Sequence, residues 1–117
     1  MLFRSDIAAL DDAEKRVATT IKSLVKKYRF KDAVAEKGDE ARIHVGVIAQ
    51  EVAAAFEAEG LDASRYGMFC SDTWYEVDGQ MKNSDGVFYT EQSEGAVKQT
   101  RLAIRYDELL AFVISVL

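Results

Sequence analysis

The stretch from Ile43 to Gly60 changes its hydrophobic period midway, and this change constrains the fold more than any other feature of the sequence. Its first part alternates apolar residues with polar or small ones, which is the period of a half-buried strand. The apolar residues of that part are Ile43, Val45 and Val47. The next apolar residues fall at helical intervals, opposite glutamine and glutamate. They are Ile48, Val52, Ala55 and Phe56. Gly60 stands where a left-handed residue ends a helix, with Leu61 placed to fold back on the last turn. The stretch predicts a strand, a tight junction, a helix and a glycine stop.

A further helix is predicted between Ser5 and Tyr28. Ser5 or Asp6 can begin it. Asp11 followed by Glu14 three residues later forms the better capping box, so we favour a start at Asp11. Its apolar residues recur at alternating steps of three and four, as in a heptad. They are Ile7, Leu10, Val17, Ile21, Leu24 and Tyr28. This stripe fits a helix that packs on its own domain, and it also fits a seam shared between copies of the chain.

A hairpin is predicted after this helix. Residues Tyr28 to Ala35 read as a strand with Phe30 and Val34 on one side. The polar run from 36 to 40 then turns the chain into the strand that contains Ile43.

Residues 62–104 combine aromatic side chains with Asp-Gly pairs, a composition typical of β-hairpins. The pairs at 78–79 and 85–86 favour tight turns, because glycine accepts a positive φ. We predict strands at Thr73–Val77 and Val87–Thr90 around a long projecting loop. Glu91–Thr100 is polar and without period, so it is predicted to be loop or flexible arm. The whole is a projecting hairpin arm at about residues 75–100, and a segment this long without its own core usually has a function or a partner.

The end of the chain predicts a last strand and a closing helix. Arg101–Tyr106 alternates apolar residues inward, and Asp107 can cap a helix over Glu108–Leu117. That helix is apolar nearly all round and must be buried on most sides. A monomer of 117 residues has little to cover it with, so we expect burial against other copies. The predicted trimer-interface residues are Leu109, Leu110, Phe112, Val113 and Leu117.

Length and charge narrow the function classes. The 117 residues predict one domain, and the net charge of −5 argues against a nucleic-acid partner. The apolar tail Leu109–Leu117 is too short to span a bilayer, and Met1–Arg4 lacks the apolar core of a signal peptide, so no membrane partner is expected.

Few residues offer catalytic or metal chemistry. Cys70 is the single cysteine and allows no internal disulfide. His44 is the single histidine, so a histidine-rich zinc site is absent, and no cofactor or metal is expected. We favour a hydrogen-bonded structural role for His44 and a small apolar role for Cys70, although a Cys–His nucleophile pair is formally possible.

Three segments resemble a known family. They read HVGVIAQE at His44–Glu51, GLDASRYG at Gly60–Gly67 and RYDELL at Arg105–Leu110. Segments like these, in this order, resemble the C-terminal intramolecular chaperone domains of bacteriophage tailspikes and tail fibres, and the resemblance covers about residues 7 to 117. The motif residues to which it gives a role in folding and assembly are His44, Gly46, Gln50, Glu51, Arg65, Tyr66, Arg105 and Tyr106.

The resemblance implies a trimerising chaperone that promotes folding of an upstream β-stalk. The implied fold class is α+β, with helices packed in a homotrimeric core that carries β-hairpins and the projecting arm. Such a domain would act in the cytoplasm of the infected bacterial host and be absent from the mature virion. Two alternatives stay open, a self-cleaving serine peptidase and a generic oligomerising binding module.

The resemblance also implies release by self-cleavage at the N-terminal edge. The family uses a serine followed by aspartate as nucleophile and a lysine five residues after the serine as base. Here Ser5 precedes Asp6, but Leu10 occupies the position of the base. Alignment on the downstream Leu-Asp-Asp-Ala instead puts Arg4 near the lysine and the serine before Met1, and arginine is a poor base. No catalytic residue is therefore predicted in this sequence.

Overall fold

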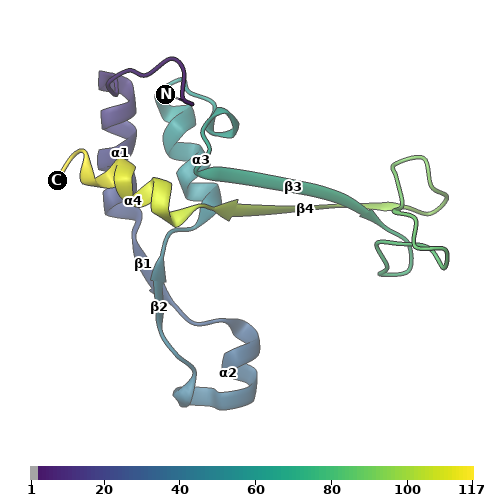
Figure 1. Cartoon of the computed structure of the whole chain (residues 1–117). Helices are drawn as coiled ribbons and strands as arrows, with labels where there is room; N and C mark the ends of the chain where they lie inside the picture. Colours follow the sequence, from purple (N-terminus) through teal and green to yellow (C-terminus); the bar gives the residue numbers. More distant parts are fainter. Residues whose placement is uncertain (1–2) are drawn as a thin grey trace.

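The computed structural model describes residues 3–117 and has a mixed α+β fold. Three helices form a body, a short hairpin carries a small lobe below it, and a long hairpin projects from its side (Figure 1). The elements in chain order are α1 (Asp12–Leu24), β1 (Lys26–Tyr28), α2 (Lys31–Lys37), η1 (Gly38–Glu40), β2 (His44–Gly46), α3 (Ala49–Ala58), η2 (Ala63–Arg65), β3 (Phe69–Glu76), β4 (Val97–Ile104) and α4 (Tyr106–Ile114).

Helix α1 begins where the capping box predicts. The backbone N–H of Glu14 donates to Oδ1 of Asp11 over 2.8 Å, and the N–H of Asp11 donates to Oε1 of Glu14 over 2.8 Å. The helix is shorter than predicted, because residue 7 precedes it and Tyr28 belongs to β1. Val17 and Ile21 are buried in the core of the same chain, and Leu10 and Leu24 pack against it, so the interpretation as packing on its own domain is confirmed for this part of the stripe. Ile7 and Tyr28, the two ends of the stripe, are 69% and 38% exposed.

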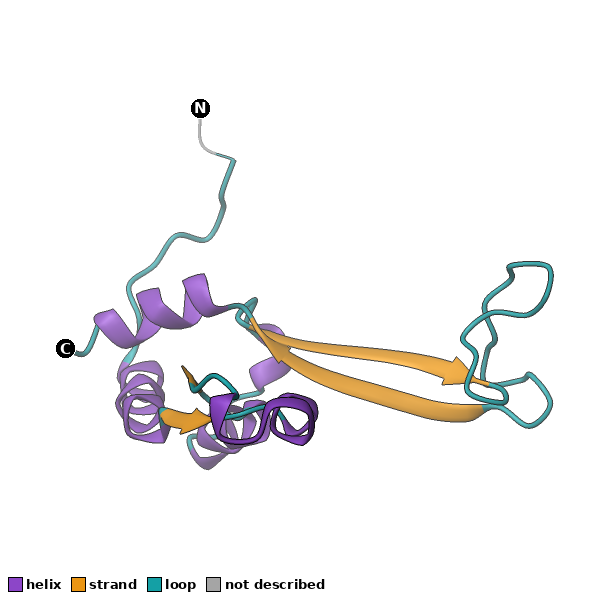
Figure 2. Cartoon of the chain, turned by 90° about the horizontal axis from the view of Figure 1, so that it is seen from below, coloured by secondary structure: helices purple, strands orange, loops and turns teal. Residues whose placement is uncertain are grey.

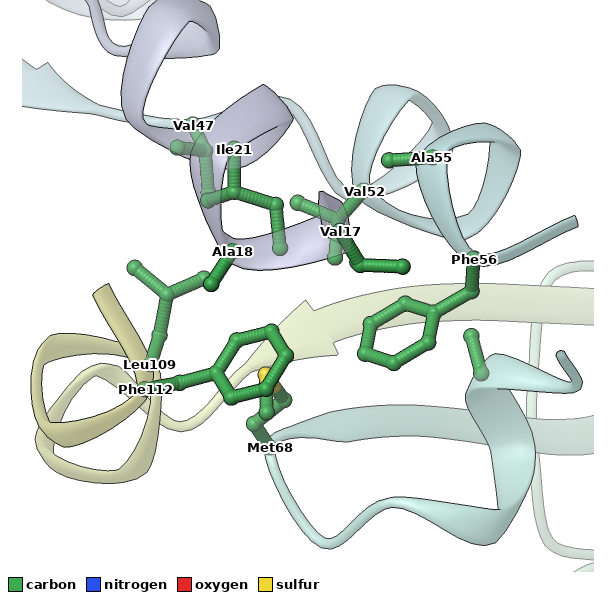
Figure 3. Close-up of a cluster of buried hydrophobic side chains, with 11 residues drawn as sticks. Val17, Ala18, Ile21, Val47, Val52, Ala55, Phe56, Met68, Leu109 and Phe112 are labelled. Atoms are coloured by element: carbon green, nitrogen blue, oxygen red, sulfur yellow. The ribbon is translucent and has the colours of Figure 1, made fainter. Parts of the chain in front are cut away.

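The core lies between α1, α3 and α4 (Figure 3). Phe56 of α3 is fully buried, and its ring stacks on that of Phe112 with the centroids 5.9 Å apart. The ring of Tyr66 lies 4.6 Å from Phe56 on another side. Burial of such aromatic rings removes a large apolar area from water, and this stabilises the three-helix body. The four largest fully buried side chains are Phe56, Ile21, Val17 and Val52.

Helix α3 ends at the predicted glycine stop. Gly60 has a φ of 73°, and its N–H donates to the carbonyl of Glu57 over 2.9 Å. The N–H of Leu61 donates to the carbonyl of Phe56 over 2.9 Å. These two bonds satisfy carbonyls that a helix end leaves without partners. The predicted strand, junction and helix are all present here.

The short hairpin differs from its prediction in three respects. The strand predicted at Tyr28–Ala35 is wrong, because β1 ends at Tyr28 and the good helix formers of Lys31–Lys37 fold as α2. Strands β1 and β2 do pair antiparallel, with Tyr28 opposite His44, but α2 and η1 connect them in place of a polar turn. The prediction of a half-buried strand at Ile43 and Val45 is also wrong, since these side chains are 64% and 71% exposed.

The long hairpin pairs β3 with β4 from Phe69 opposite Ile104 to Glu76 opposite Val97. The predicted strand Thr73–Val77 lies almost wholly in β3. Val87–Thr90 was predicted as a strand, but it lies in the tip and holds only an isolated bridge between Lys82 and Phe88. Residues 97–100, predicted as loop, belong to β4, because a solvated ribbon is held by its backbone hydrogen bonds and needs no apolar alternation. Figure 2 shows this ribbon projecting away from the helices, with its loops at the far end.

Helix α4 starts earlier than predicted. Tyr106 is its first residue and Arg105 its N-cap, without a side-chain hydrogen bond, so the predicted cap at Asp107 is wrong. Leu109 and Phe112 face the chain's own core and are 3% and 5% exposed. The other three predicted interface residues lie elsewhere on the helix. Val113 is half-buried, and Leu110 and Leu117 are exposed. Within residues 3–117, none of the helices has the length and apolar character needed to cross a membrane.

Candidate functional site

The first and third sequence motifs meet where Tyr106 covers Gly46. A Cβ atom added to Gly46 would lie 2.5 Å from Oη of Tyr106, so the phenol occupies the space that a side chain would fill. The N–H of Val47 donates to that Oη over 3.2 Å, and the hydroxyl lies 3.4 Å from the carbonyl oxygen of Val47. Glycine at position 46 therefore lets the start of α4 pack directly against the end of β2 (Figure 1).

The second and third motifs also meet, at Gly67 and at Met68, the residue that follows the second motif. The backbone N–H of Arg105 donates to the carbonyl of Met68 over 2.8 Å. A Cβ atom on Gly67 would lie 2.8 Å from Oε1 of Glu108 in the first turn of α4. The segment 105–110 thus contacts both other motifs. The rigid phenol of Tyr106 explains the need for glycine at position 46, whereas the flexible, half-exposed side chain of Glu108 beside Gly67 can move aside.

Asp62 fixes the loop that enters the second motif. Its carboxylate accepts from the N–H of Ser64 over 3.0 Å and from the Ser64 hydroxyl over 2.7 Å. These hydrogen bonds to the ionised form lower the pKa of Asp62 below its ordinary value. The result is a local N-cap for η2, whose other end is closed by the N–H of Tyr66 donating to the carbonyl of Ala63.

Tyr66 joins the second motif to the start of α1. Its hydroxyl donates to Oε2 of Glu14 over 2.7 Å, while Oε1 of the same carboxylate holds the N–H of Asp11. Burial of the phenol, with the hydrogen bond to Glu14 second, raises the pKa of Tyr66 to about 12. One carboxylate therefore connects the helix start to the η2 loop.

The remaining motif residues lie nearer the surface. Glu51 pairs with Lys26 over 2.5 Å, which ties α3 to β1. Gln50 and Arg65 are exposed, and the Arg105 guanidinium lies 4.0 Å from Glu108. An exposed ion pair of this length contributes little to stability.

His44 lies against aromatic rings rather than in a hydrogen bond. Its ring centroid is 5.8 Å from that of Tyr28 and 4.8 Å from that of Phe30. Its side chain is exposed and makes no hydrogen bond within residues 3–117, so the predicted hydrogen-bonded role is replaced by aromatic packing.

The residues considered for chemistry lie apart from this junction. Ser5 is exposed, and its hydroxyl has no hydrogen-bond partner in the described part of the chain. Cys70 is half-buried in β3, and no hydrogen bond joins it to His44 in the same residues. A cluster of three or more histidine, cysteine or acidic side chains suited to a metal ion does not occur between residues 3 and 117.

Sequence reasoning assigned Glu14 only a capping role. Its second carboxylate oxygen, which accepts from Tyr66, was missed because the two residues are 52 positions apart. The aromatic pair Tyr28 and Phe30 was missed as part of the site. The alternation of these rings with Lys27 and Arg29 was the available signal, since it puts both rings on one side of an extended segment.

Replacing Tyr66 by phenylalanine is expected to lower the free energy of unfolding by about 1 kcal/mol near neutral pH, because the hydrogen bond to Glu14 is lost. The part of the unfolding free energy that changes with pH through the titration of Tyr66 should disappear as well. The pKa of Tyr66 is raised from 10.0 to about 12, so the folded state holds this proton more tightly. Its contribution is complete below pH 10 and is lost as the pH rises through 12. Urea unfolding across this pH range measures both effects. Equal slopes of unfolding free energy against pH for the wild type and the variant would contradict the role given to the Tyr66 hydroxyl.

Two solved structures superpose on the fold of this chain. A crystal structure described as a novel intramolecular chaperone superposes with a TM-score of 0.74 and 33% identity, over 97% of this chain and 89% of that one. The carboxy-terminal domain of the bacteriophage T5 L-shaped tail fibre, with its intramolecular chaperone domain, superposes with a TM-score of 0.66 and 22% identity, over 97% of this chain and 27% of that one. The fold and its motif junction define an intramolecular chaperone domain of the phage tail spike and tail fibre type.

Sequence comparison gives the family. The family described as chaperone of endosialidase, Peptidase S74, matches residues 3–61, and the chain belongs to it. The probable tail spike protein of Klebsiella phage 0507-KN2-1 is 35% identical over 126 aligned positions, which cover 97% of this chain and 10% of that protein. The tail spike protein of Escherichia virus K5 is 40% identical over 89, covering 71% and 12%. The chain thus spans about a tenth of the length of these curated relatives.

Proposed function

We propose that this domain forms a homotrimer that brings three copies of an upstream tail spike or tail fibre polypeptide into register. The observation that supports the proposal most is the apolar stripe of Leu110, Ile114 and Leu117 at the end of the chain. Their side chains are 56%, 62% and 83% exposed, at helical intervals of four and three. Leu109 and Phe112 already fill the chain's own core, so among the predicted interface residues Leu110 and Leu117 carry the contact, with Val113 at its edge.

Trimerisation explains how such a domain would help a fibre to fold. Contacts in a trimeric β-stalk are non-local and interchain, so they form slowly and expose strand edges meanwhile. A compact domain that associates first holds three chain ends together and raises their effective concentration. Its own core and its β3–β4 ribbon form within one chain and need no second copy. The domain can therefore fold before the stalk does.

The long hairpin is the second element suited to this function. Its tip, beyond the paired strands, exposes the apolar residues Met81, Val87 and Phe88, which are 44%, 60% and 58% exposed. An arm with an apolar tip can cover unpaired edges of the growing stalk. In this proposal the arm of about residues 75–100 contacts the stalk, and the helices contact one another.

The proposal assigns release by cleavage to a longer polypeptide that contains this domain, and not to residues 1–117 alone. The proposed setting is the cytoplasm of the infected host, with the domain cut away before the virion is complete. Ser5 and Asp6 are exposed beside the half-buried Leu10, which cannot accept a proton. The self-cleaving peptidase is therefore the weaker candidate for residues 1–117 themselves.

Leu110→Asp is the variant that tests the trimer. We expect the wild-type chain to sediment as a trimer at micromolar concentration and Leu110→Asp as single chains, because a charge at a buried interface lacks a partner. Val97→Asp is the matched control, since Val97 is 57% exposed on β4, away from α4. A trimeric Leu110→Asp would remove this stripe from the interface.

Co-expression with an upstream stalk tests the chaperone itself. Trimer yield of the stalk is expected to fall when residues 1–117 are deleted and to fall similarly with Leu110→Asp. A stalk that trimerises equally well without the domain would leave only a generic oligomerising module.

A further inference from the structure

An apolar groove lies between the short hairpin and the base of the long one. It has a volume of 540 Å³ and is lined on one side by Tyr28, Phe30 and Ile48. Leu102, Ile104 and Tyr106 line the other side. The first three side chains are 38%, 55% and 45% exposed, although each is large and apolar. The groove therefore presents unpartnered apolar surface in the single chain.

The wall of the groove is fixed before any partner arrives. The rings of Tyr28 and Phe30 meet edge to face at 84°, with centroids 5.5 Å apart, and His44 packs behind both. Tyr106 is held by its hydrogen bond to the N–H of Val47. A pre-formed apolar wall binds a partner with little loss of side-chain entropy.

The stripe of Leu110, Ile114 and Leu117 cannot fill the groove of its own chain. Tyr106, the first residue of α4, lines the groove, and Ile114 lies roughly 12 Å further along the helix axis at 1.5 Å per residue. Leu109 and Phe112 anchor the helix on the core, and α4 runs away from the long hairpin, at whose base the groove lies (Figure 1). One chain thus carries a groove and a stripe that only a second copy can bring together.

Charge favours this pairing. The segment 26–31 contains Lys26, Lys27, Arg29 and Lys31 and no acidic residue, within a chain of net charge −5. Lys26 pairs with Glu51, and Lys27 and Arg29 alternate with the two rings that line the groove. Residues 109–117, which carry the stripe, contain no charged side chain, and Asp107 and Glu108 precede them next to Tyr106 in the groove wall. The carbonyl end of α4 adds partial negative charge with no basic side chain in its last turn. The partial negative charge at the end of α4 is therefore opposite in sign to the basic segment 26–31.

We infer that the α4 stripe of one copy binds in the Tyr28–Ile48–Tyr106 groove of the next copy. This inference rests on the proposed trimer and specifies its contact. The contact joins two different surfaces, so successive copies close into a ring when each is rotated by a third of a turn. The alternative geometry is a bundle in which three α4 stripes contact one another around the axis and the grooves stay empty.

Two variants separate these geometries and keep the fold intact. Ile48 is the N-cap of α3, with φ −93° and ψ 123°, a position that favours aspartate, so Ile48→Asp places a charge in the groove without harming the helix. Ile114 ends α4, where a cation is favourable, so Ile114→Lys alters the stripe and is repelled by the basic segment 26–31. Circular dichroism of each variant checks the fold.

Each variant alone is expected to sediment as single chains, with Val97→Asp staying trimeric as the matched control. An equal mixture of the two variants is expected to form a two-chain complex, because Ile114→Lys keeps an intact groove and Ile48→Asp keeps an intact stripe. A trimeric Ile48→Asp, or a mixture that stays monomeric, overturns the inference. A monomeric wild type instead overturns the proposed trimer itself, so the two failures are distinguishable.

Cysteine crosslinking gives a second measurement that does not depend on dissociation. In a Cys70→Ser background, the pair Ile48→Cys and Ile114→Cys is expected to crosslink between chains with a short bis-maleimide, whereas Ile114→Cys alone is not. Crosslinking by Ile114→Cys alone indicates the bundle and overturns the inference. If the groove instead binds a different partner, Ile48→Asp would leave the isolated trimer intact and lower only the yield of a fused stalk, and this result also overturns the inference.

Discussion

Phe56→Ala is expected to lower the free energy of unfolding by about 3–5 kcal/mol. The ring of Phe56 is fully buried between α1, α3 and α4 and contacts the rings of Tyr66 and Phe112. Its removal forfeits the transfer free energy of the ring and leaves a cavity that three helices anchored elsewhere cannot close. A loss of this size is a large fraction of the stability of a small domain. Urea unfolding at a fixed protein concentration, followed by circular dichroism, measures it.

Phe3→Ala is the matched control for this prediction. Phe3 carries the same side chain but is 91% exposed in the segment before α1, so its replacement is expected to change the free energy by less than about 0.5 kcal/mol. Equal effects of the two substitutions would show that Phe56 does not hold the helices together. Because the fixed concentration keeps any association constant, the difference between the variants reports packing within one chain.

Elements with strong local signals were predictable from sequence. The capping box at Asp11 and the stop at Gly60 are chemical requirements of helix ends, so their residue types locate those ends. The helical spacing from Val52 to Phe56 predicted which face of α3 would be buried. These signals act within a few residues, and tertiary structure did not override them.

Elements fixed by distant contacts were not predictable. Phe30 and Val34 suggested a strand, but their side chains stay 55% and 39% exposed, and the helix propensity of Lys31–Lys37 decides the structure. Strand β4 pairs with β3 across a tip of some twenty residues, and no apolar period marks its polar half. The start of α4 at Tyr106 depends on the contact of that phenol with Gly46, which lies far away in sequence.

The candidate site likewise combines features that the sequence predicted with features that depend on distant contacts. Resemblance named the motif residues, but it gave no reason for a glycine at 46 or 67 beyond membership of a motif. The structure supplies that reason for Gly46, since the rigid phenol of Tyr106 occupies the space beside it, whereas only the movable carboxylate of Glu108 lies beside Gly67. It also separates the predicted interface residues into two groups by exposure. Residues in an apolar helix all look alike in sequence, and only packing distinguishes the core-facing Leu109 from the exposed Leu110.

Gly46→Ala is expected to lower the free energy of unfolding by about 1–3 kcal/mol, and Tyr106→Phe in the same chain is expected to restore part of that loss. The added methyl group would lie 2.5 Å from Oη and 3.2 Å from Cζ of Tyr106, so the rigid phenol must move. Its movement breaks the hydrogen bond from the N–H of Val47 and loosens the start of α4. Removal of Oη takes away the atom in closest conflict and leaves the ring in place.

The double-mutant cycle makes this prediction quantitative. Tyr106→Phe alone is expected to cost about 0.5–1.5 kcal/mol, because the N–H of Val47 loses its acceptor. If the two residues were independent, the double variant would cost the sum of both changes. We expect it to cost less than that sum by at least about 0.5 kcal/mol, because the hydrogen bond can be lost only once and the clash is relieved. Urea unfolding of the four chains measures the coupling, and strict additivity would show that Gly46 is needed for a reason other than Tyr106.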